Sequence, residues 1–425
     1  MSTLIPDSQS CQTLADWLCY IEHNHPIHQI ELGLERVNTV AGRANLQQLP
    51  GRTVLIGGTN GKGTTARCLE QLLLAQGYSV GVYTSPHLLH FNERLRINGT
   101  DVDNEHWVAG FAFIEQLRAD IALTYFEFTT LVAFYLLRQQ PCDFCLIEVG
   151  LGGRLDATNI VAPDVSVITT VDLDHQDWLG DNREAIGFEK AGIFRAGKVA
   201  VIGELQAPAS VLAQAQLLGC NTVLAQQHYQ YQQHSTNWSW HGQHSQLDGL
   251  PYPAMPVQNA ACALAVLEQL ACLPAREQVR NVLATLTLAG RMQWLQQSPA
   301  IIIDVAHNPQ SARYLAEQLQ ALKPRFSKLK ALVGMLKDKD IAQTLAPLTS
   351  LFDQWHLVSL PGARGANAQH MVKYLPDTVS DITLHDEVLT AYGNVSATLK
   401  TDELLVVFGS FITVSAVLAG HQEAR

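Results

Sequence analysis

The chain lacks long apolar runs: nothing in its 425 residues approaches the roughly 20 consecutive apolar residues that a membrane-spanning helix needs. Its N-terminal stretch, MSTLIPDSQSCQTLADW, lacks a basic segment followed by an apolar one, so we expect no signal peptide and a cytoplasmic protein. Basic residues are also few, since 28 Lys and Arg stand against 39 Asp and Glu, a formal charge of −11. This balance argues against a general nucleic-acid or membrane-surface binder, so we expect neither partner.

Paired cysteines at metal-site spacing are lacking as well. Cys142 and Cys145 form one C-x-x-C, and no second pair follows at the spacing of a zinc site. Because Cys145 stands inside the apolar run 144–150, we expect buried structural thiols. Four histidines fall in polar, alternating sequence, namely His228, His234, His241 and His244. That setting favours a solvated face over a metal site.

Short apolar runs alternate with longer helical patterns, as in an α/β fold with a parallel sheet. In the first part of the chain these runs are almost continuously apolar, which is typical of strands covered on both faces. We predict five strands there, at 53–57, 79–84, 144–150, 165–171 and 198–203. A helix over 66–77 should follow the first strand and end at Gly77. Residues 204–256, rich in Gln, His and aromatics, predict a few short strands at the sheet periphery.

A second α/β series begins near residue 299. Its predicted strands lie at 300–306, 329–335, 354–360 and 404–410. The polar stretch 293–298 and Pro299 indicate a linker between the two series. We therefore expect an N-terminal domain with a mostly parallel sheet over residues 1–297 and a C-terminal α/β domain over residues 298–425.

A glycine-rich turn follows the first strand, in TVLIGGTNGKGTTARCLEQLL. Glycines allow a sharp bend that brings backbone N–H groups close to phosphate oxygens, and the next helix adds the positive end of its dipole. Lys62 supplies a point charge for the outer phosphates, and Thr64 and Thr65 offer hydroxyl groups. The match to G-x-x-x-x-G-K-[ST] is imperfect, because its first glycine is missing and Gly63 follows Lys62. An ordinary strand–helix turn stays open as the alternative.

Polar side chains lie near the end of several predicted strands or directly after it, namely Ser85, Glu148, Asp172, Asp174 and His175. In parallel sheets ligands bind beyond the carboxyl ends of the strands, so these groups could hold Mg²⁺ beside a nucleotide. Glu148 ends a strongly apolar run, and a buried carboxylate is costly unless it is paired or bound to metal. Capping or a surface hydrogen bond is the alternative for each residue alone. For His175 the alternative is that it contacts a metal ligand rather than the metal itself.

Taken together, these motifs resemble the Mur ligase superfamily and, within it, the bacterial bifunctional dihydrofolate synthase/folylpolyglutamate synthases. The resemblance is carried over nearly the whole chain by IELGLERV (30–37), GTNGKGTT (58–65), YTSPHL (83–88), LTYFEFTT (123–130), IEVGLGGRLDATN (147–159), LDHQDWLG (173–180), EKAGIF (189–194), GR (290–291) and DVAHNP (304–309). It implies a P-loop ATPase domain and a Rossmann-like glutamate-ligase domain. It also implies that ATP phosphorylates a carboxylate of a pterin-linked substrate and that the amine of L-glutamate attacks the acyl phosphate.

The resemblance implies the following site residues on the nucleotide side. Gly61, Lys62, Gly63, Thr64, Asn259, Arg291 and Asp304 would contact ATP, and Ser85, Glu148 and His175 would bind magnesium. Lys62, Lys190 and His307 would serve catalysis, with Lys190 as a carbamate and His307 on the glutamate side. ATP, Mg²⁺ and a monovalent cation are the implied cosubstrate and cofactors. The alternatives are a helix N-cap for Asn259, pairing with Glu189 for Lys190 and a linker salt bridge for Arg291.

On the pterin side the resemblance implies three segments: Glu31, Leu32, Gly33 and Leu34; Thr124, Tyr125, Phe126 and Glu127; and Leu155, Asp156 and Ala157. Glu31 stands where the family pattern usually has an aspartate. Phe126 could stack on the pterin ring or pack in the core. The implied substrates are dihydropteroate, reduced folates and L-glutamate, and we expect a monomer.

Three other functions stay open. The first is a folylpolyglutamate synthase without dihydrofolate synthase activity. The second is a ligase of peptidoglycan precursors, which the pterin motifs disfavour. The third is a nucleotide-binding switch or ATPase that ligates nothing, and its ATP turnover would be independent of glutamate and pterin.

Overall fold

The computed structural model describes residues 7–27 and 29–423, so the first six residues of the stretch examined for a signal peptide lie outside it. The chain forms two compact units. The N-terminal unit comprises residues up to Val171 together with 182–253 and 257–286, and the C-terminal unit comprises 172–181, 254–256 and 287–425. Within the described residues, no helix is long and apolar enough to cross a membrane.

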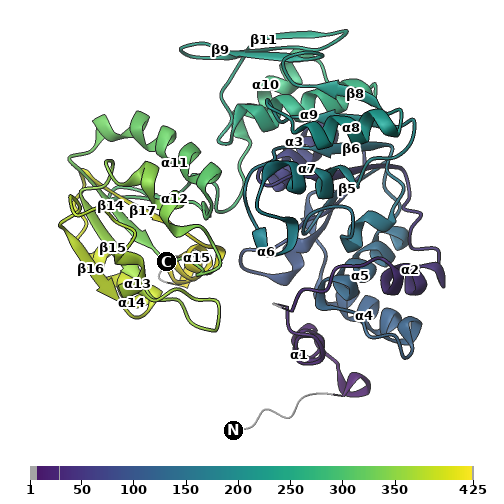
Figure 1. Ribbon diagram of the computed structural model, residues 1–425, viewed down its shortest axis with the longest axis horizontal. Coiled ribbons are helices and arrows are strands. Elements are labelled where there is room, and N and C mark those ends of the chain that lie inside the picture. The colour runs from purple at the N-terminus through teal and green to yellow at the C-terminus, as the bar shows by residue number, and fades with distance from the viewer. Residues whose placement is uncertain (1–6, 28, 424–425) are drawn as a thin grey trace. The chain divides into compact units, whose positions relative to one another are not determined.

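The main sheet of the N-terminal unit has eight strands in the order β4-β3-β2-β5-β1-β6-β7-β8 (Figure 1). The strands are β1 (Arg52–Gly57), β2 (Val80–Tyr83), β3 (Leu95–Ile97), β4 (Thr100–Asp101), β5 (Phe144–Glu148), β6 (Val165–Ile168), β7 (Val199–Ile202) and β8 (Asn221–Leu224). Six of them run parallel, and β3 and β4 add an antiparallel edge. The five predicted strands are confirmed. The short edge strands were missed because their sequences are brief and partly polar.

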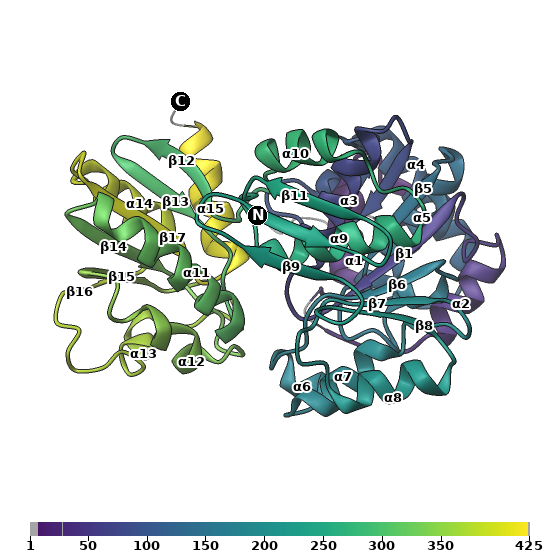
Figure 2. The same ribbon diagram turned by 90° about the horizontal axis from the view of Figure 1, so that it is seen from above.

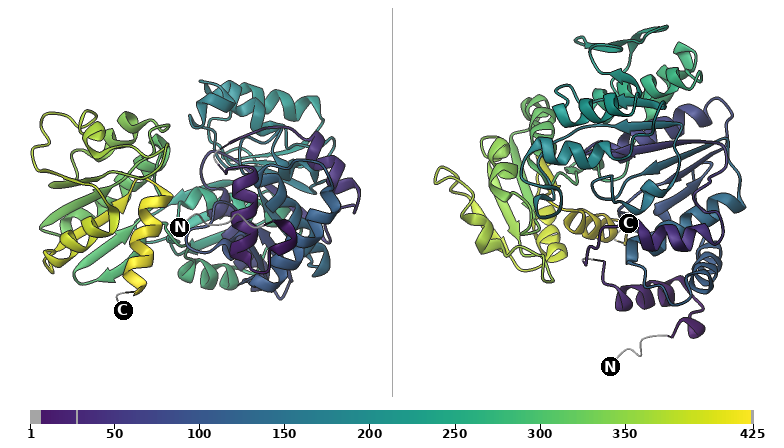
Figure 3. Two further views of the ribbon diagram at one scale, coloured as in Figure 1. Left: turned by 90° about the horizontal axis from the view of Figure 1, so that it is seen from below. Right: turned by 45° about the vertical axis from the view of Figure 1, so that its right-hand side comes forward.

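Helices cover this sheet. They are α1 (Leu14–Asn24), α2 (Glu35–Gly42), α3 (Lys62–Leu74), α4 (Asn104–Arg118), α5 (Tyr125–Gln139), α7 (Arg183–Ala191), α8 (Ala209–Leu217), α9 (Val257–Gln269) and α10 (Arg276–Thr285), with 3₁₀ turns η1 (Ser8–Ser10), η2 (Phe91–Arg94) and η3 (Ala157–Ile160). Helix α3 packs on β1, β2 and β5 and beside α9. Helix α1 lies against α4 and α5, and α2 lies against α5; the N-terminal helices are the dark purple ones beside the blue helices in Figure 3. The helix predicted over 66–77 corresponds to α3, which starts earlier, at Lys62, and ends at Leu74. It stops before Gly77, which has φ +85°.

Residues 204–256 depart from the expected peripheral strands. Only β8 joins the edge of the main sheet, and 209–217 form helix α8. The remaining strands β9 (Gln230–Gln233), β10 (Trp238–His241) and β11 (Gln246–Leu250) make a separate antiparallel sheet, which stands apart from the main sheet in Figure 1. Trp238 and Trp240 are fully buried and donate their indole N–H groups to backbone carbonyls. These two indoles anchor the small sheet.

The histidines and cysteines singled out in the sequence lie as expected. His234, His241 and His244 are exposed and His228 is half-buried. Cys142 and Cys145 are buried, and burial raises the pKa of their thiols to about 11 and about 12. These thiols are protonated at neutral pH, which suits a structural role.

The C-terminal unit is built on a six-stranded sheet in the order β12-β13-β17-β14-β15-β16 (Figure 2). Its strands are β12 (Gln293–Gln297), β13 (Ala300–Ile303), β14 (Lys328–Val333), β15 (Gln354–Val358), β16 (Ile382–His385) and β17 (Glu403–Phe408). Its helical elements are α6 (Gln176–Leu179), α11 (Pro309–Leu322), η4 (Lys323–Arg325), α12 (Ile341–Leu345), η5 (Ala346–Leu348), α13 (Ala368–Val372), α14 (Val388–Ala397) and α15 (Phe411–Glu423).

The four strands predicted for this unit are confirmed, but the linker prediction for 293–298 is wrong. That stretch is the antiparallel edge strand β12, paired with β13. Strand β12 lies at the edge of the sheet, and only Leu295 among its residues is buried. Its other residues can therefore be polar, which is why the stretch resembles a linker. The compact unit begins at Thr287, before the predicted boundary.

Glu70 provides a test of the N-terminal core. Its fully buried carboxylate, on α3, pairs with Arg67 at 2.8 Å and with Arg96 of β3 at 3.0 Å. We predict that Glu70→Met lowers the free energy of unfolding by about 3–5 kcal/mol, because it leaves the partly buried guanidinium groups of Arg67 and Arg96 without their carboxylate partner. The exposed pair of Glu277 and Arg280, 3.7 Å apart, is the control. Denaturant unfolding of Glu277→Met should show a loss below about 1 kcal/mol.

His356 provides a pH test of the C-terminal core. Burial, then the like charges of His385 and Lys330, lower its pKa to about 4. The unfolded chain, with an ordinary histidine pKa near 6.5, takes up the proton first as the pH falls. The contribution of His356 to the free energy of unfolding is therefore fully present above about pH 6.5 and is lost as the pH falls toward about 4. Denaturant titrations should show a weaker pH dependence for His356→Leu, whereas His244→Leu, at an exposed site, should behave like the parent protein. An unchanged dependence in His356→Leu would contradict this assignment.

Candidate active site

The glycine-rich turn after β1 leads directly into helix α3. Gly61 caps the helix in a left-handed conformation with φ +87°, and Lys62 is the first helical residue. The Lys62 ammonium donates to the carbonyl oxygen of Gly58 at 3.0 Å. The Thr64 hydroxyl donates to the Gly61 carbonyl at 2.9 Å and accepts from the amide of Asn259 at 2.7 Å. The turn thus has the open backbone and the helix N-terminus that a phosphate group needs.

One glycine of this turn is required by a close neighbour. A Cβ on Gly61 would lie only 2.5 Å from Oδ1 of Asn259, whereas a Cβ on Gly63 would lie 3.5 Å from a carboxylate oxygen of Glu148, an ordinary contact distance. Asn259 is the third residue of α9, so the N-cap alternative for it is wrong. Its buried side chain instead braces the phosphate turn from the neighbouring helix.

Ser85 and Glu148 meet at the same edge of the sheet. Strands β2 and β5 are parallel neighbours, with Tyr83 paired to Ile147, so the loop after β2 faces the end of β5. The backbone N–H of Ser85 donates to the Glu148 carboxylate at 3.3 Å, and Glu148 is 6% exposed. A serine hydroxyl and a buried carboxylate are hard oxygen donors of the kind that Mg²⁺ prefers, so these two residues fit a magnesium site.

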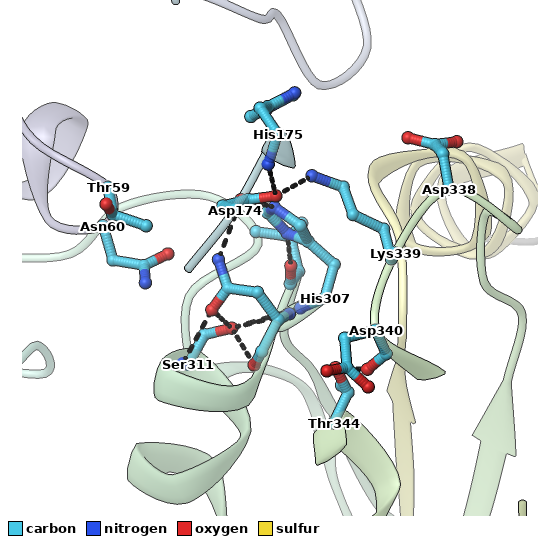
Figure 4. Close-up of polar contacts among 12 residues, drawn as sticks. Thr59, Asn60, Asp174, His175, His307, Ser311, Asp338, Lys339, Asp340 and Thr344 are labelled. Atoms are coloured by element: carbon cyan, nitrogen blue, oxygen red, sulfur yellow. Dashed lines mark hydrogen bonds and ion pairs between the residues drawn. The ribbon is translucent and has the colours of Figure 1, made fainter. Parts of the chain in front are cut away.

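His175 lies in segment 172–181, which packs with the C-terminal unit. It has φ +51°, and its backbone N–H donates to Asp174 at 2.8 Å. Asp174 is held in turn by Lys339 at 2.5 Å and by the amide of Asn308 at 3.2 Å (Figure 4). Lysine and histidine charges hold the pKa of the Asp174 carboxyl far below its usual range, against the effect of burial.

His307 borders the same cluster in the C-terminal unit (Figure 4). Its Nδ1 lies 2.7 Å from the carbonyl oxygen of Val305, and its Nε2 lies 3.8 Å from Asp174. Burial and the Lys339 charge lower its pKa to about 4, so the ring is neutral near pH 7. A neutral imidazole of this kind can exchange a proton with a ligand.

Arg291 and Asp304 lie at the start of the C-terminal sheet. The buried Asp304 carboxylate accepts from the backbone N–H groups of Met292 and Ala306, each at 2.8 Å. Burial raises its pKa, and the charge of Arg291 opposes that rise. The Arg291 guanidinium also lies over the Phe411 ring, 5.4 Å from its centre. Asp304 therefore fixes the backbone around Arg291.

Lys190 is buried near the end of α7, at 3% exposure. Its neighbour Glu189 pairs with Arg154 at 2.8 Å. The carbamate on Lys190 stays a prediction, at a position that is buried.

The three segments expected on the pterin side come together in the N-terminal unit. Arg36 joins two of them, since it pairs with Glu31 at 2.8 Å and with the buried Glu127 at 3.3 Å. The N–H of Gly33 donates to the carbonyl of Leu155 at 3.3 Å, which joins the first segment to the third. Leu32 and Leu34 flank this contact in sequence and are half-buried.

The other residues on the pterin side have identifiable local roles. Thr124 and Glu127 form a capping box at the start of α5, where Tyr125 is buried. The Phe126 ring is half-buried against the backbone of Gly150, where a Cβ would lie 2.5 Å from it. Asp156 caps η3 through Thr158, next to the buried Ala157, and burial raises its pKa.

Arg36 and Lys339 were missed at the sequence level. Arg36 lies inside the motif LGLERV and Lys339 inside the charged run KDKD, so the residues themselves were visible. Their partners lie 91 and 165 positions away, which no local pattern shows.

Comparison with known proteins identifies the family. The model of the Mur ligase middle domain matches residues 56–289, and that of the Mur ligase glutamate ligase domain matches residues 290–411. The dihydrofolate synthase/folylpolyglutamate synthase of Escherichia coli (strain K12) is 44% identical over 410 residues, covering 96% of this chain and 96% of that protein.

Two solved structures agree with this result. Escherichia coli FolC in complex with DHPP and ADP matches with a TM-score of 0.94 and 43% identity, covering 99% of this chain and 100% of that one. A bifunctional folylpolyglutamate synthase/dihydrofolate synthase from Yersinia pestis, complexed with AMPPNP and Mn ion, matches with a TM-score of 0.91 and 46% identity, over 99% and 100% of the two chains. The chain belongs to the Mur ligase family and, within it, to the group of dihydrofolate synthase/folylpolyglutamate synthases.

Proposed function

We propose that this protein is an ATP-dependent ligase that adds L-glutamate to dihydropteroate, giving dihydrofolate, and to reduced folates, giving folylpolyglutamates. The observation that carries the proposal is the meeting of three features at one sheet edge: the glycine-rich turn before α3, Ser85 after β2 and the buried Glu148 at the end of β5. A turn for phosphate and a carboxylate for metal, side by side, suit phosphoryl transfer from a nucleotide.

The nucleotide would lie with its phosphates on the glycine-rich turn. The helix N-terminus at Gly61 to Thr64 and the Lys62 ammonium neutralise phosphate charge, and Asn259 keeps Thr64 in place. Ser85 and Glu148 would hold Mg²⁺, which supplies charge neutralisation of the phosphates when bound, with His175 as the third proposed ligand.

The acceptor is a carboxylic acid with a pterin at its other end. The cluster of Arg36, Glu31 and Glu127, with the Gly33–Leu155 contact, is where we place the pterin. Phosphorylation turns a carboxylate oxygen into a good leaving group, and the amine of glutamate then displaces it as phosphate. The protein has to align the reactants and keep out water, because the acyl phosphate hydrolyses readily.

The C-terminal unit would serve the second half of the reaction. We assign Arg291 and Asp304 to the nucleotide and His307 to the glutamate side, where its neutral ring could accept a proton from the incoming amine. The proposal includes a carbamylated Lys190 and a monovalent cation as a further cofactor. It also includes a monomeric state and a cytoplasmic location, where ATP is plentiful.

One assay tests the function and separates its rivals. ADP release is measured with ATP and Mg²⁺ alone, after adding L-glutamate, and after adding dihydropteroate or a reduced folate as well. Release that requires glutamate and occurs with both acceptors supports the bifunctional enzyme. Release with only the folate supports the folylpolyglutamate synthase alternative. Turnover that is indifferent to glutamate and acceptor would contradict any ligase.

Glu148 gives a sharper test of the proposed metal site. We predict that Glu148→Gln lowers turnover by at least about 100-fold, because it removes a charge that would hold the metal at the phosphates. Circular dichroism should show a folded protein. Glu105→Gln, at an exposed position in the first turn of α4, is the matched control and should keep full activity. Near-normal turnover in Glu148→Gln would remove this residue from the metal site.

A further inference from the structure

Arg94 is a buried arginine that no carboxylate neutralises. It ends η2, immediately before β3, and is 2% exposed. Its one hydrogen bond from the side chain runs from Nε to Nδ1 of His87, at 2.9 Å. Within residues 7–27 and 29–423, Nη1 and Nη2 of Arg94 make no hydrogen bond and no ion pair. The two ends of its fork are therefore free.

The surroundings of Arg94 are aromatic. Its guanidinium lies over the rings of Phe91 and Tyr125, 5.4 and 5.8 Å from their centres. His87 cannot neutralise Arg94 either, because burial and the Arg94 charge lower its pKa to about 4 and its ring is neutral. Cation–π contacts recover only a part of what a cation loses on leaving water.

Two other arginines of the same unit do have carboxylate partners. Arg96, two residues later, pairs with Glu70 at 3.0 Å, and Arg118, which also lies over an aromatic ring, pairs with Glu115 at 2.6 Å. Both of these arginines therefore have a carboxylate partner, whereas the partly buried Arg195 of the same unit donates instead to several backbone carbonyl oxygens. A buried guanidinium left without one is costly unless a ligand brings the negative charge.

The position of Arg94 indicates which ligand this is. Its carbonyl oxygen accepts from Thr84, which precedes the proposed metal ligand Ser85. On its other side lies Tyr125, between Thr124 and Phe126 of the proposed pterin segment. Arg94 thus lies between the pterin side and the metal side, where the acid end of a pteroyl substrate would have to pass.

We propose that the free Nη1–Nη2 fork of Arg94 binds a carboxylate of the pteroyl acceptor and positions it for phosphorylation. This inference rests on the proposed function. The planar fork of arginine matches a carboxylate with two parallel hydrogen bonds, which gives orientation as well as affinity. The aromatic rings and His87 hold the guanidinium in place, so the site is preformed before the acceptor arrives.

Equilibrium binding of two ligands tests the proposal, in the presence of ADP and Mg²⁺. One ligand is dihydropteroate, and the other is the analogue in which hydrogen replaces the carboxylate. We expect Arg94→Met to weaken dihydropteroate binding by about 10- to 100-fold and to leave binding of the analogue unchanged. Arg94→Lys, which keeps the charge without the fork, should lose part of the affinity for the acid only. If Arg94→Met does not fold, the lysine variant carries the test.

Arg118→Met is the control, because it also removes an arginine that lies over an aromatic ring but is already paired. It should leave both affinities unchanged. Equal weakening of the two ligands by the Arg94 variants would show a structural role and overturn the proposal, and so would unchanged binding of the acid. A parent protein that binds neither ligand would overturn the proposed function, and this inference with it.

Discussion

The parallel alignment of β1, β2 and β5 is the constraint on which the rest of the site depends. In a parallel sheet all carboxyl ends meet at one edge, so chain segments far apart in sequence arrive together. The register pairs Ile56 of β1 with Glu148 of β5, and Tyr83 of β2 with Ile147 of β5. The phosphate turn, Ser85 and Glu148 are thereby fixed relative to one another by backbone hydrogen bonds before any ligand binds.

Buried charged side chains in this chain have two kinds of surroundings, and the difference indicates which of them serve structure and which serve binding. Glu70 is buried with two arginines around it, as a core charge should be. Arg94 is buried near the edge where we place the reactants, and the proposed acceptor would bring it a group of opposite charge. Stability given up at such a position would be recovered when the ligand binds, which would favour binding in one orientation.

Much of this arrangement could be predicted from the sequence. Continuous apolar runs gave nine strands, and the glycine-rich turn and Glu148 were identified from local chemistry alone. The errors arise where local pattern and tertiary setting differ. The stretch 293–298 looks like a linker because an edge strand needs few apolar residues. Residues 204–256 were predicted to form a few short strands, and the helix over 209–217 within them was missed. Asn259 sits where a helix N-cap is plausible, but its partner Thr64 is 195 residues away.

Long-range pairing is also why Arg94 could not be recognised from the sequence. Its significance is the lack of an acid within reach, and sequence spacing does not reveal which charges lack partners. The same holds for Lys339, which fixes Asp174 beside His175 through a contact across 165 positions. The resemblance to a family supplied the expected ligands, and the structure supplied the geometry of the strand ends.

The transfer of oxygen from substrate to phosphate tests the central claim most directly. Dihydropteroate labelled with ¹⁸O in both carboxylate oxygens is converted with ATP and L-glutamate, and the phosphate released is analysed by mass spectrometry. If the carboxylate is phosphorylated before glutamate attacks, each phosphate carries one ¹⁸O atom from the acid. Phosphate without label, formed alongside dihydrofolate, would contradict activation of the acid by the nucleotide.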